Sequence, residues 1–226
     1  MDFNITNFGV IEIAGINIWI TETLVNTWIV MAVLITVAII IRMKLTYTDS
    51  PRGLQNVAEY IVELFDGFVR SAAGDKLAGL GNWFFAVFFF VLISNIGGMF
   101  FRPPTADWAT TFGLALVSFT LIQVMGFKHR KGAYLKSFIE PVFLFAPLNI
   151  IGELARPISL SFRLFGNILA GMILMGLLYN MAPLPVLIGI PAFLHFYFDL
   201  AMGTLQAYIF TVLSLSFIGG MAGTAE

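Results

Sequence analysis

The chain contains no cysteine and few charged residues. Of its 226 residues, 11% are charged and 59% are hydrophobic, whereas about 25% of the residues of a soluble domain are charged. The missing cysteines exclude disulfides, cysteine-ligated metals and thiol catalysis. The scarcity of charge excludes a soluble globular protein. With a net charge of -1 and no basic run longer than Lys128 to Lys131, the sequence gives no electrostatic basis for nucleic-acid binding.

Common catalytic motifs are also absent from the sequence. It has no HExxH-type metal motif, no serine or cysteine nucleophile elbow and no glycine-rich phosphate loop. We therefore expect neither a cofactor nor a metal. No internal repeat is visible, so the inverted-repeat architecture of many secondary transporters is not supported.

Long uncharged segments are the main feature that the sequence does have. Trp83 to Phe101, Trp108 to Phe127 and Leu164 to Phe198 each reach the roughly 18 apolar residues that indicate a membrane helix. The expected fold is an all-α integral membrane protein with about five membrane helices and one amphipathic surface helix. Its last two helices are expected to be long and steeply tilted, and to form a hairpin.

The expected organisation is a single polytopic membrane domain over residues 1–226. No basic region precedes the first apolar segment, so we expect that segment to remain as a helix rather than to be cleaved as a signal peptide. In chain order, the expected segments are an outside N-terminal segment (1–22), a membrane helix (23–43), an amphipathic helix on the cytoplasmic surface (53–72), two membrane helices (82–101 and 107–127), and a tilted membrane-embedded hairpin (137–179 and 186–219).

Positive charges set the expected orientation in the membrane. The first basic residue is Arg42, at the far end of the first apolar segment, and the densest basic cluster is Lys128 to Lys131. The positive-inside rule places both in the cytoplasm and the N-terminus outside. Counting helices then places the C-terminus in the cytoplasm. Because the N-terminus does not resemble a transit peptide, the expected location is a bacterial plasma membrane.

One arginine lies inside the apolar stretch SLSFRLFGNILAG. Arg163 is the last basic residue of the chain, and its burial in hydrocarbon costs at least about 2.5 to 3.5 kcal/mol. It must face a wet cavity, a carboxylate or a partner, or else snorkel to the cytoplasmic interface. Glu153 and Arg156, spaced i, i+3, already mark that interface, and Arg163 lies about 10 Å deeper at ~1.5 Å per residue. This depth favours a functional role.

Polar residues flank the arginine on one side of its helix. Ser159, Arg163 and Asn167 follow one another at i, i+4 spacing and are succeeded by small residues. The small residues fit close helix packing in lipid equally well. Towards the inner side, Glu153 and Asn149 together with Ser159 can line a path for ions.

The second helix of the hairpin carries a second polar group. His195, Asp199 and Gln206 share one broad face. If the turn centres near Pro183 to Pro185, Gln206 lies level with Arg163, and Asp199 lies about 10 Å nearer the outside at ~1.5 Å per residue. An acid and an imidazole there can relay protons. The alternative is that Asp199 is a neutral, hydrogen-bonded structural group and that His195 only bonds a neighbour.

At these residues the sequence resembles subunit a of F-type ATP synthases. PISLSFRLFGNILAG is similar to the family's signature around its essential arginine, and LQAYIFTVLSLSFI is similar to its last helix. FFVLISNIGG and RPPTADWATTFGLAL are similar to its central pair of helices. The resemblance extends over nearly the whole chain from about Ile16 onward.

The resemblance implies a function and a set of partners. The family translocates ions, H⁺ or Na⁺, and thereby drives a rotation that is coupled to ATP synthesis or hydrolysis elsewhere in the complex, so the chain would not act on ATP itself. The implied partners are the c-subunit ring, the b-subunit peripheral stalk and the remaining ATP synthase subunits in a lipid bilayer, with no nucleic acid.

The resemblance also assigns roles to individual residues. Arg163 would be the cation that faces the c-ring carboxylate, with Asn167 and Gln206 as its polar neighbours. Asp199 falls where many relatives carry a histidine in the outer half-channel, and Asn95 matches a polar position of the central helices.

Two positions depart from the family pattern. Met172 and Gly98 stand where several relatives carry an ionisable residue. Our hypothesis is therefore that Asp199, alone or with His195, carries the outer half-channel.

Two rival interpretations belong to other classes. A stand-alone ion channel or transporter would use Arg163 to bind an anionic substrate. A membrane enzyme would use Asp199 and His195 as an acid/base pair. Co-purification of a ring of small two-helix subunits and a soluble ATPase head would distinguish the synthase subunit from both.

Overall fold

The computed structural model describes residues 7–13, 16–45, 53–74, 79–137, 143–181 and 189–222. Within these ranges, five helical segments are long and apolar enough to cross a membrane, and the last two are the longest. They confirm the predicted all-α membrane class. The segments are α1 (Glu22–Lys44), α3 with the turn that follows it (Gly81–Met99), α4 (Trp108–Arg130), α6 with the turn that precedes it (Phe143–Met181), and the continuous helical stretch Ile190–Met221.

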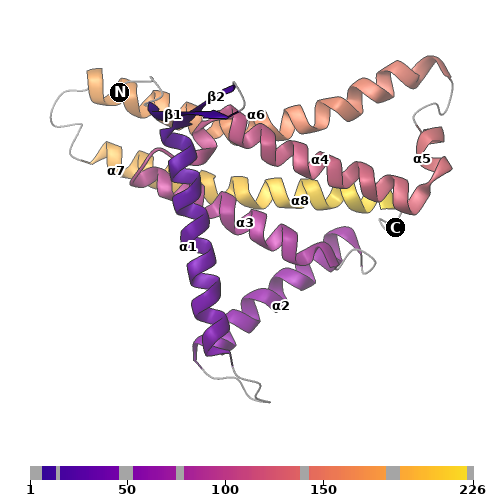
Figure 1. Cartoon of the computed structure of the whole chain (residues 1–226), viewed down its shortest axis with the longest axis horizontal. Coiled ribbons are helices and arrows are strands. Elements are labelled where there is room, and N and C mark those ends of the chain that lie inside the picture. Colours follow the sequence, from indigo (N-terminus) through magenta and orange to yellow (C-terminus); the bar gives the residue numbers. More distant parts are fainter. Residues whose placement is uncertain are drawn as a thin grey trace.

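A β-hairpin precedes the first helix. Strands β1 (Asn7–Ile13) and β2 (Ile16–Thr21) pair antiparallel, with Ile13 opposite Ile16 and an irregularity between Asn7 and Gly9. Sequence analysis assigned no secondary structure to this part of the chain. Both strands are rich in isoleucine, whose branched side chain suits extended backbone. Figure 1 shows the hairpin at the upper end of α1.

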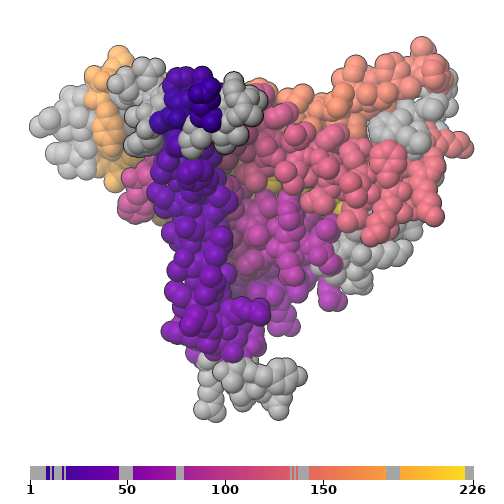
Figure 2. Space-filling model, viewed as in Figure 1, coloured from indigo at the N-terminus to yellow at the C-terminus, as the bar shows by residue number. Residues whose placement is uncertain are grey.

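Helix α1 lies at the edge of the molecule. Thr21 caps its N-terminus by accepting a hydrogen bond from the Leu24 amide at 3.3 Å. Its N-terminal end is attached to the loop between α3 and α4, because Thr23 donates to Asp107 at 3.1 Å and Asn26 donates to the Arg102 carbonyl at 2.9 Å. Figure 2 shows the helix as a column along one side of the molecule. Its exposed aliphatic surface is suited to lipid.

Helix α2 (Leu54–Ala73) is amphipathic and joins α1 to the helical core. Glycines with positive φ flank it: Gly53 at 66° and Gly74 at 82°, a conformation that residues with a Cβ rarely adopt. Phe65, Val69 and Ala73 are buried, and they pack with residues of α3, α4 and α8. The predicted amphipathic helix is therefore anchored to the core through one edge of its apolar face.

Helix α8 (Gly203–Ala222) is the centre of the packing. One hydrophobic cluster joins its Leu215 and Ile218 to α2, α3 and α4. A second cluster joins its Ala207 and Phe210 to α3, α4 and α6, with Leu164 of α6 among the buried members. Figure 1 shows α4, α6 and α8 running side by side, across the direction of α1.

The last two membrane segments form the long hairpin that carries most of the candidate site. Helix α6 (Ala146–Met181) has 36 residues, or about 54 Å at ~1.5 Å per residue, against a hydrocarbon core of about 30 Å. It continues through Pro157, which is buried. The returning stretch begins with α7 (Ile190–His195), where Pro191 occupies the first turn and so starts the helix instead of bending it. The π-helix Phe196–Met202 then leads into α8.

Candidate functional site

Arg163 lies near the middle of α6 with its side chain exposed. The residues three and four positions away on the helix are Ser159, Leu160, Gly166 and Asn167, so the guanidinium lies among uncharged side chains of its own helix. Among the described residues, no carboxylate or other side chain forms an ion pair or hydrogen bond with this guanidinium. This agrees with the register estimate, which placed Gln206, and not Asp199, level with Arg163.

Gln206 lies beside Arg163, as the register estimate predicts. Its side-chain amide donates a hydrogen bond to the backbone carbonyl of Arg163, and the glutamine is buried. A glutamine can therefore link α8 to α6 at the level of the arginine without pairing with the guanidinium. One turn further along α6, the amide nitrogen of Asn167 is buried and has no hydrogen-bond partner within the described ranges. Both amides flank Arg163 as expected.

A hollow of about 190 Å³ lies along α6 on the side of Arg163 that faces Arg156. It is lined by Gly152, Ala155, Arg156, Ser159, Leu160 and Arg163 of α6 with Leu213 and Phe217 of α8. Ser159 is exposed and contributes its hydroxyl to this surface. Small residues and a hydroxyl therefore leave room for water between the two arginines.

A largely buried polar network lies at the end of this hollow that Arg156 lines. Glu153 accepts hydrogen bonds from Arg156 at 2.9 Å and from Gln123 of α4 at 3.0 Å. The Tyr134 hydroxyl of α5 (Gly132–Ser137) donates to the side-chain oxygen of Gln123. The Arg156 guanidinium also lies over the ring of Phe217 in α8, 4.8 Å from its centroid. Burial and the nearby Glu153 carboxylate raise the pKa of Tyr134, which keeps its hydroxyl a donor. The predicted Glu153–Arg156 pair is therefore part of a junction between four helices.

Replacing Glu153 with leucine is expected to destabilise this junction. The substitution leaves Arg156 and Gln123 without their shared acceptor, and a buried unsatisfied polar group costs about 1 to 3 kcal/mol. Thermal aggregation of the chain in the purified complex measures the loss. Glu153→Gln keeps an acceptor oxygen and should lower the aggregation temperature much less. Equal aggregation temperatures for Glu153→Leu and the parent would contradict this role of Glu153.

His195 and Asp199 form the second polar group of the hairpin. The His195 Nδ1 and an Asp199 carboxylate oxygen are 2.7 Å apart, and their side chains are 29% and 16% exposed. Asp199 lies in the π-helix and its carboxylate approaches Gly98, where an added Cβ would be 3.2 Å from Asp199 Oδ1. Gly98, which has no side chain, thus provides space for the acid of another helix.

The remaining predicted residues lie at different places along the helices. Asn149 occupies the first turn of α6, one turn before Glu153. Asn95, near the end of α3, is fully buried and accepts a hydrogen bond from Thr105 at 2.7 Å. Nothing in the described ranges links Asp199 directly to the Arg163 guanidinium. The structure therefore brings the predicted residues together in separate groups rather than in one continuous line.

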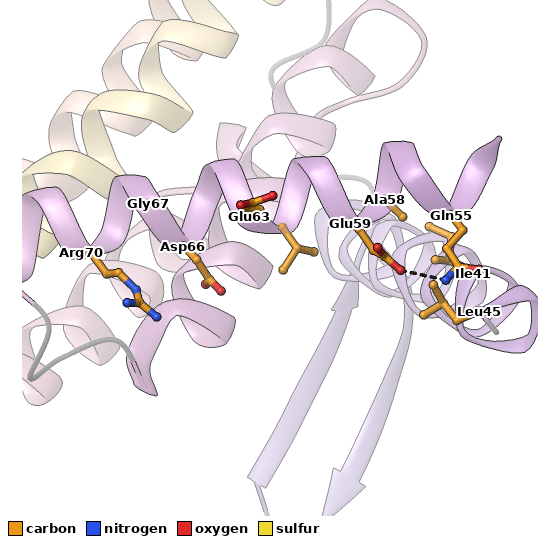
Figure 3. Close-up of a pocket in the computed structure, with 10 residues that line it drawn as sticks. Ile41, Leu45, Gln55, Ala58, Glu59, Glu63, Asp66, Gly67 and Arg70 are labelled. Atoms are coloured by element: carbon orange, nitrogen blue, oxygen red, sulfur yellow. Dashed lines mark hydrogen bonds between the residues drawn. The ribbon is translucent and has the colours of Figure 1, made fainter. Parts of the chain in front are cut away.

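A pocket of about 990 Å³ between α1 and α2 is separate from these groups. Figure 3 shows the polar residues of α2 that line it, including Glu59, Asp66 and Arg70, with Ile41 of α1 and the following Leu45 beside the first turns. None of its lining residues comes from the hairpin. Within the described ranges, no group of three or more His, Asp or Glu side chains could hold a metal ion.

Sequence reasoning missed Gln123, Tyr134 and Thr105. Gln123 carried a usable signal, because an amide inside the uncharged segment Trp108 to Phe127 needs a polar partner in the membrane. Tyr134 lay in a short helix beyond that segment, and Thr105 lay in a proline-rich loop. Neither position shows a periodic pattern from which its contacts could be predicted.

Comparison with known proteins gives consistent matches over most of the chain. A family model described as ATP synthase A chain matches residues 24–219. The chain is 36% identical to the sodium ion specific ATP synthase subunit a of Propionigenium modestum, over 92% of this chain and 76% of that protein. It is 35% identical to ATP synthase subunit a of Moorella thermoacetica, over 88% and 89% of the two chains. It is also 35% identical to ATP synthase subunit a 2 of a Bradyrhizobium species, over 91% and 90%.

Proposed function

Because this chain belongs to the ATP synthase subunit a family, we propose that it is an ion-translocating stator subunit in which Arg163 acts on a carboxylate of a rotating c-subunit ring. Membership of the family implies that the chain takes part in ion transport and that other ATP synthase subunits are its partners. The role of Arg163 and the route of the ions are the proposed details. H⁺ or Na⁺ would pass through two offset half-channels, and its flow would drive rotation and ATP synthesis.

The observation that carries the proposal is the unpaired guanidinium of Arg163. It is exposed on a helical segment that is long and apolar enough to cross a membrane, and no described side chain neutralises it. An intramembrane charge without a counter-charge is costly, so residues of this kind face water or a partner. A carboxylate on another subunit supplies the missing charge. Ser159 and the small residues around the arginine leave a surface along which such a partner can move.

Arginine is suited to this role because its guanidinium stays protonated in any protein environment. A carboxylate that comes within ~4 to 6 Å of it has its charged form favoured, and so releases its bound ion. The same fixed charge repels cations and prevents them from passing directly between the half-channels. Arg163 therefore acts as a stationary electrostatic element and does not carry the ion.

Two groups of residues supply the half-channels in this proposal. On the inner side, Asn149, Glu153 and Ser159 lead towards Arg163, and the 190 Å³ hollow between the two arginines supports this route. On the outer side, Asp199 carries the ion with His195 at 2.7 Å, and neither side chain is fully buried. Asn167 and Gln206 provide polar contacts on either side of the arginine.

The proposal also covers the membrane and the partners. The protein would lie in a bacterial plasma membrane, with the N-terminal hairpin outside and both the C-terminus and the basic end of α4 in the cytoplasm. Besides the c ring, it would contact the b-subunit peripheral stalk.

Purification through a tag on this chain tests the function. We expect a ring of small two-helix subunits and a soluble ATPase head to co-purify, and the complex in vesicles to accumulate ions when ATP is added. Comparing proton-only with sodium-containing buffer identifies the ion. A stand-alone channel would instead transport ions as the purified chain alone. Ion transport by the chain without a ring would contradict the proposal.

A further inference from the structure

The returning arm of the hairpin changes its helical geometry at Asp199. The seven residues Phe196–Met202 form a π-helix between α7 and α8. In a π-helix the hydrogen bonds run from i to i+5, which widens the turn and rotates the residues that follow. Such segments are rare and are often found at functional sites. The direction of the Asp199 side chain therefore depends on where this segment ends.

The buried side-chain amide of Asn95, in α3, is hydrogen-bonded at the C-terminal end of the π-helix. The Asn95 side chain of α3 donates a hydrogen bond to the carbonyl of Gly203 at 3.0 Å, and Gly203 is the first residue of α8. The side-chain oxygen of Asn95 accepts a hydrogen bond from the Thr105 hydroxyl at 2.7 Å. Asn95 and Thr105 are both 0% exposed. The two hydrogen bonds thus connect α3, the turn Pro104–Ala106 and the junction between the π-helix and α8.

Two glycines show how closely these segments approach one another. A Cβ added to Gly203 would lie 2.9 Å from the Cβ of Asn95, too close for any side chain without displacement. A Cβ added to Gly98 would lie 3.2 Å from the Asp199 carboxylate. The helical stretch that carries Asp199 is therefore in close contact with this region at two points: Asn95 of α3, and Gly98 in the turn Gly97–Met99 that follows α3. Only the first of these points includes a direct hydrogen bond.

We propose that Asn95 is a positioning residue for Asp199: with Thr105 it fixes the end of the π-helix and thereby the place of the carboxylate. Asn95 is not accessible to a passing ion, because it is fully buried and both ends of its amide are hydrogen-bonded within the protein. The inference rests on the proposed role of Asp199 in the outer half-channel. Under this inference, Asn95 does not contact the ion itself and acts on transport only through the position of Asp199.

Thr105→Val is the sharpest test, because it keeps the shape of the side chain and removes only the hydroxyl that holds Asn95. We expect ATP-driven ion transport by the assembled complex to fall about tenfold, since small misplacements of a functional group have effects of that order or larger. Thr211→Val is the matched control. Thr211 is equally buried, but its hydroxyl bonds only to the Ala207 carbonyl within α8. It should leave transport at the parent rate.

A second measurement reports the position of residue 199 without using transport. Because the chain has no cysteine, Asp199→Cys introduces a unique thiol into it. Its labelling by a water-soluble thiol reagent is followed as mass added to this chain in the complex. Adding Thr105→Val should change the labelling rate several-fold, and adding Thr211→Val should not. Labelling of Ala109→Cys, at the exposed start of α4, should be the same in both backgrounds.

These results separate the inference from the function on which it rests. Native transport by Thr105→Val would overturn the inference, and so would lost transport with unchanged labelling at position 199. A changed rate at Ala109→Cys as well would indicate general disruption and would also count against it. Native pumping by Asp199→Asn would instead remove the proposed function of Asp199, while the labelling rates would still report whether Asn95 and Thr105 position that segment.

Discussion

Replacing Arg163 with alanine is expected to abolish ATP-driven ion transport and ATP synthesis by the complex. Without the guanidinium, a ring carboxylate that arrives from the membrane keeps its ion, because nothing favours its charged form. The barrier between the half-channels is lost at the same time. We therefore expect Arg163→Ala to permit passive ion leak through the membrane sector, which an ion flux assay without ATP measures.

Arg163→Lys is expected to fail as well, although it conserves the formal charge. An ammonium lacks the planar, multi-donor head of arginine and can lose its proton when it is buried. Arg130→Ala is the matched control, because Arg130 is an exposed arginine in the last turn of α4 and does not line the hollow beside Arg163. It should pump at the parent rate. ATP-driven pumping by Arg163→Ala would refute the assigned role of the arginine.

The position of Arg163 and its relation to Gln206 were predictable from the sequence. A single arginine in an apolar run marks a costly charge, and the register of a hairpin follows from its turn and from the rise of a helix. The estimate placed Gln206 level with Arg163, where its amide now bonds to the arginine carbonyl. Membrane helices obey these rules well because their backbone must hydrogen-bond internally.

The surroundings of Asp199 were not predictable in the same way. Helical spacing correctly put His195 and Asp199 on one face, but a regular period of 3.6 residues cannot indicate a π-helix. The contacts of Gly98 and Gly203 with other helices depend on how α3 and α7–α8 cross. One hydrogen bond of Asn95 joins it to Gly203, more than a hundred positions further along the chain. No local pattern encodes such a pairing.

The junction around Glu153 shows the same limit. The i, i+3 spacing predicted its ion pair with Arg156, which the structure confirms. Gln123 of α4 donates to the same carboxylate, and Tyr134 of α5 donates to Gln123 in turn; both approaches depend on tertiary packing. Sequence patterns therefore predict which polar residues share a helix, while contacts between helices require the folded structure.

Asp199→Asn is the second substitution with a large expected effect. Asparagine has almost the same shape and can still bond to His195, but it cannot bind and release a proton or balance a bound cation. We expect ATP-driven transport to fall about a hundredfold, the lower range for loss of a positioned acid or base. A purely structural role for Asp199 predicts the opposite result, since the hydrogen bond survives. Pumping at the native rate by Asp199→Asn would therefore contradict the role of Asp199 as the ion-carrying group of the outer half-channel. Asp199→Glu keeps a carboxylate and should retain part of the rate that Asp199→Asn loses.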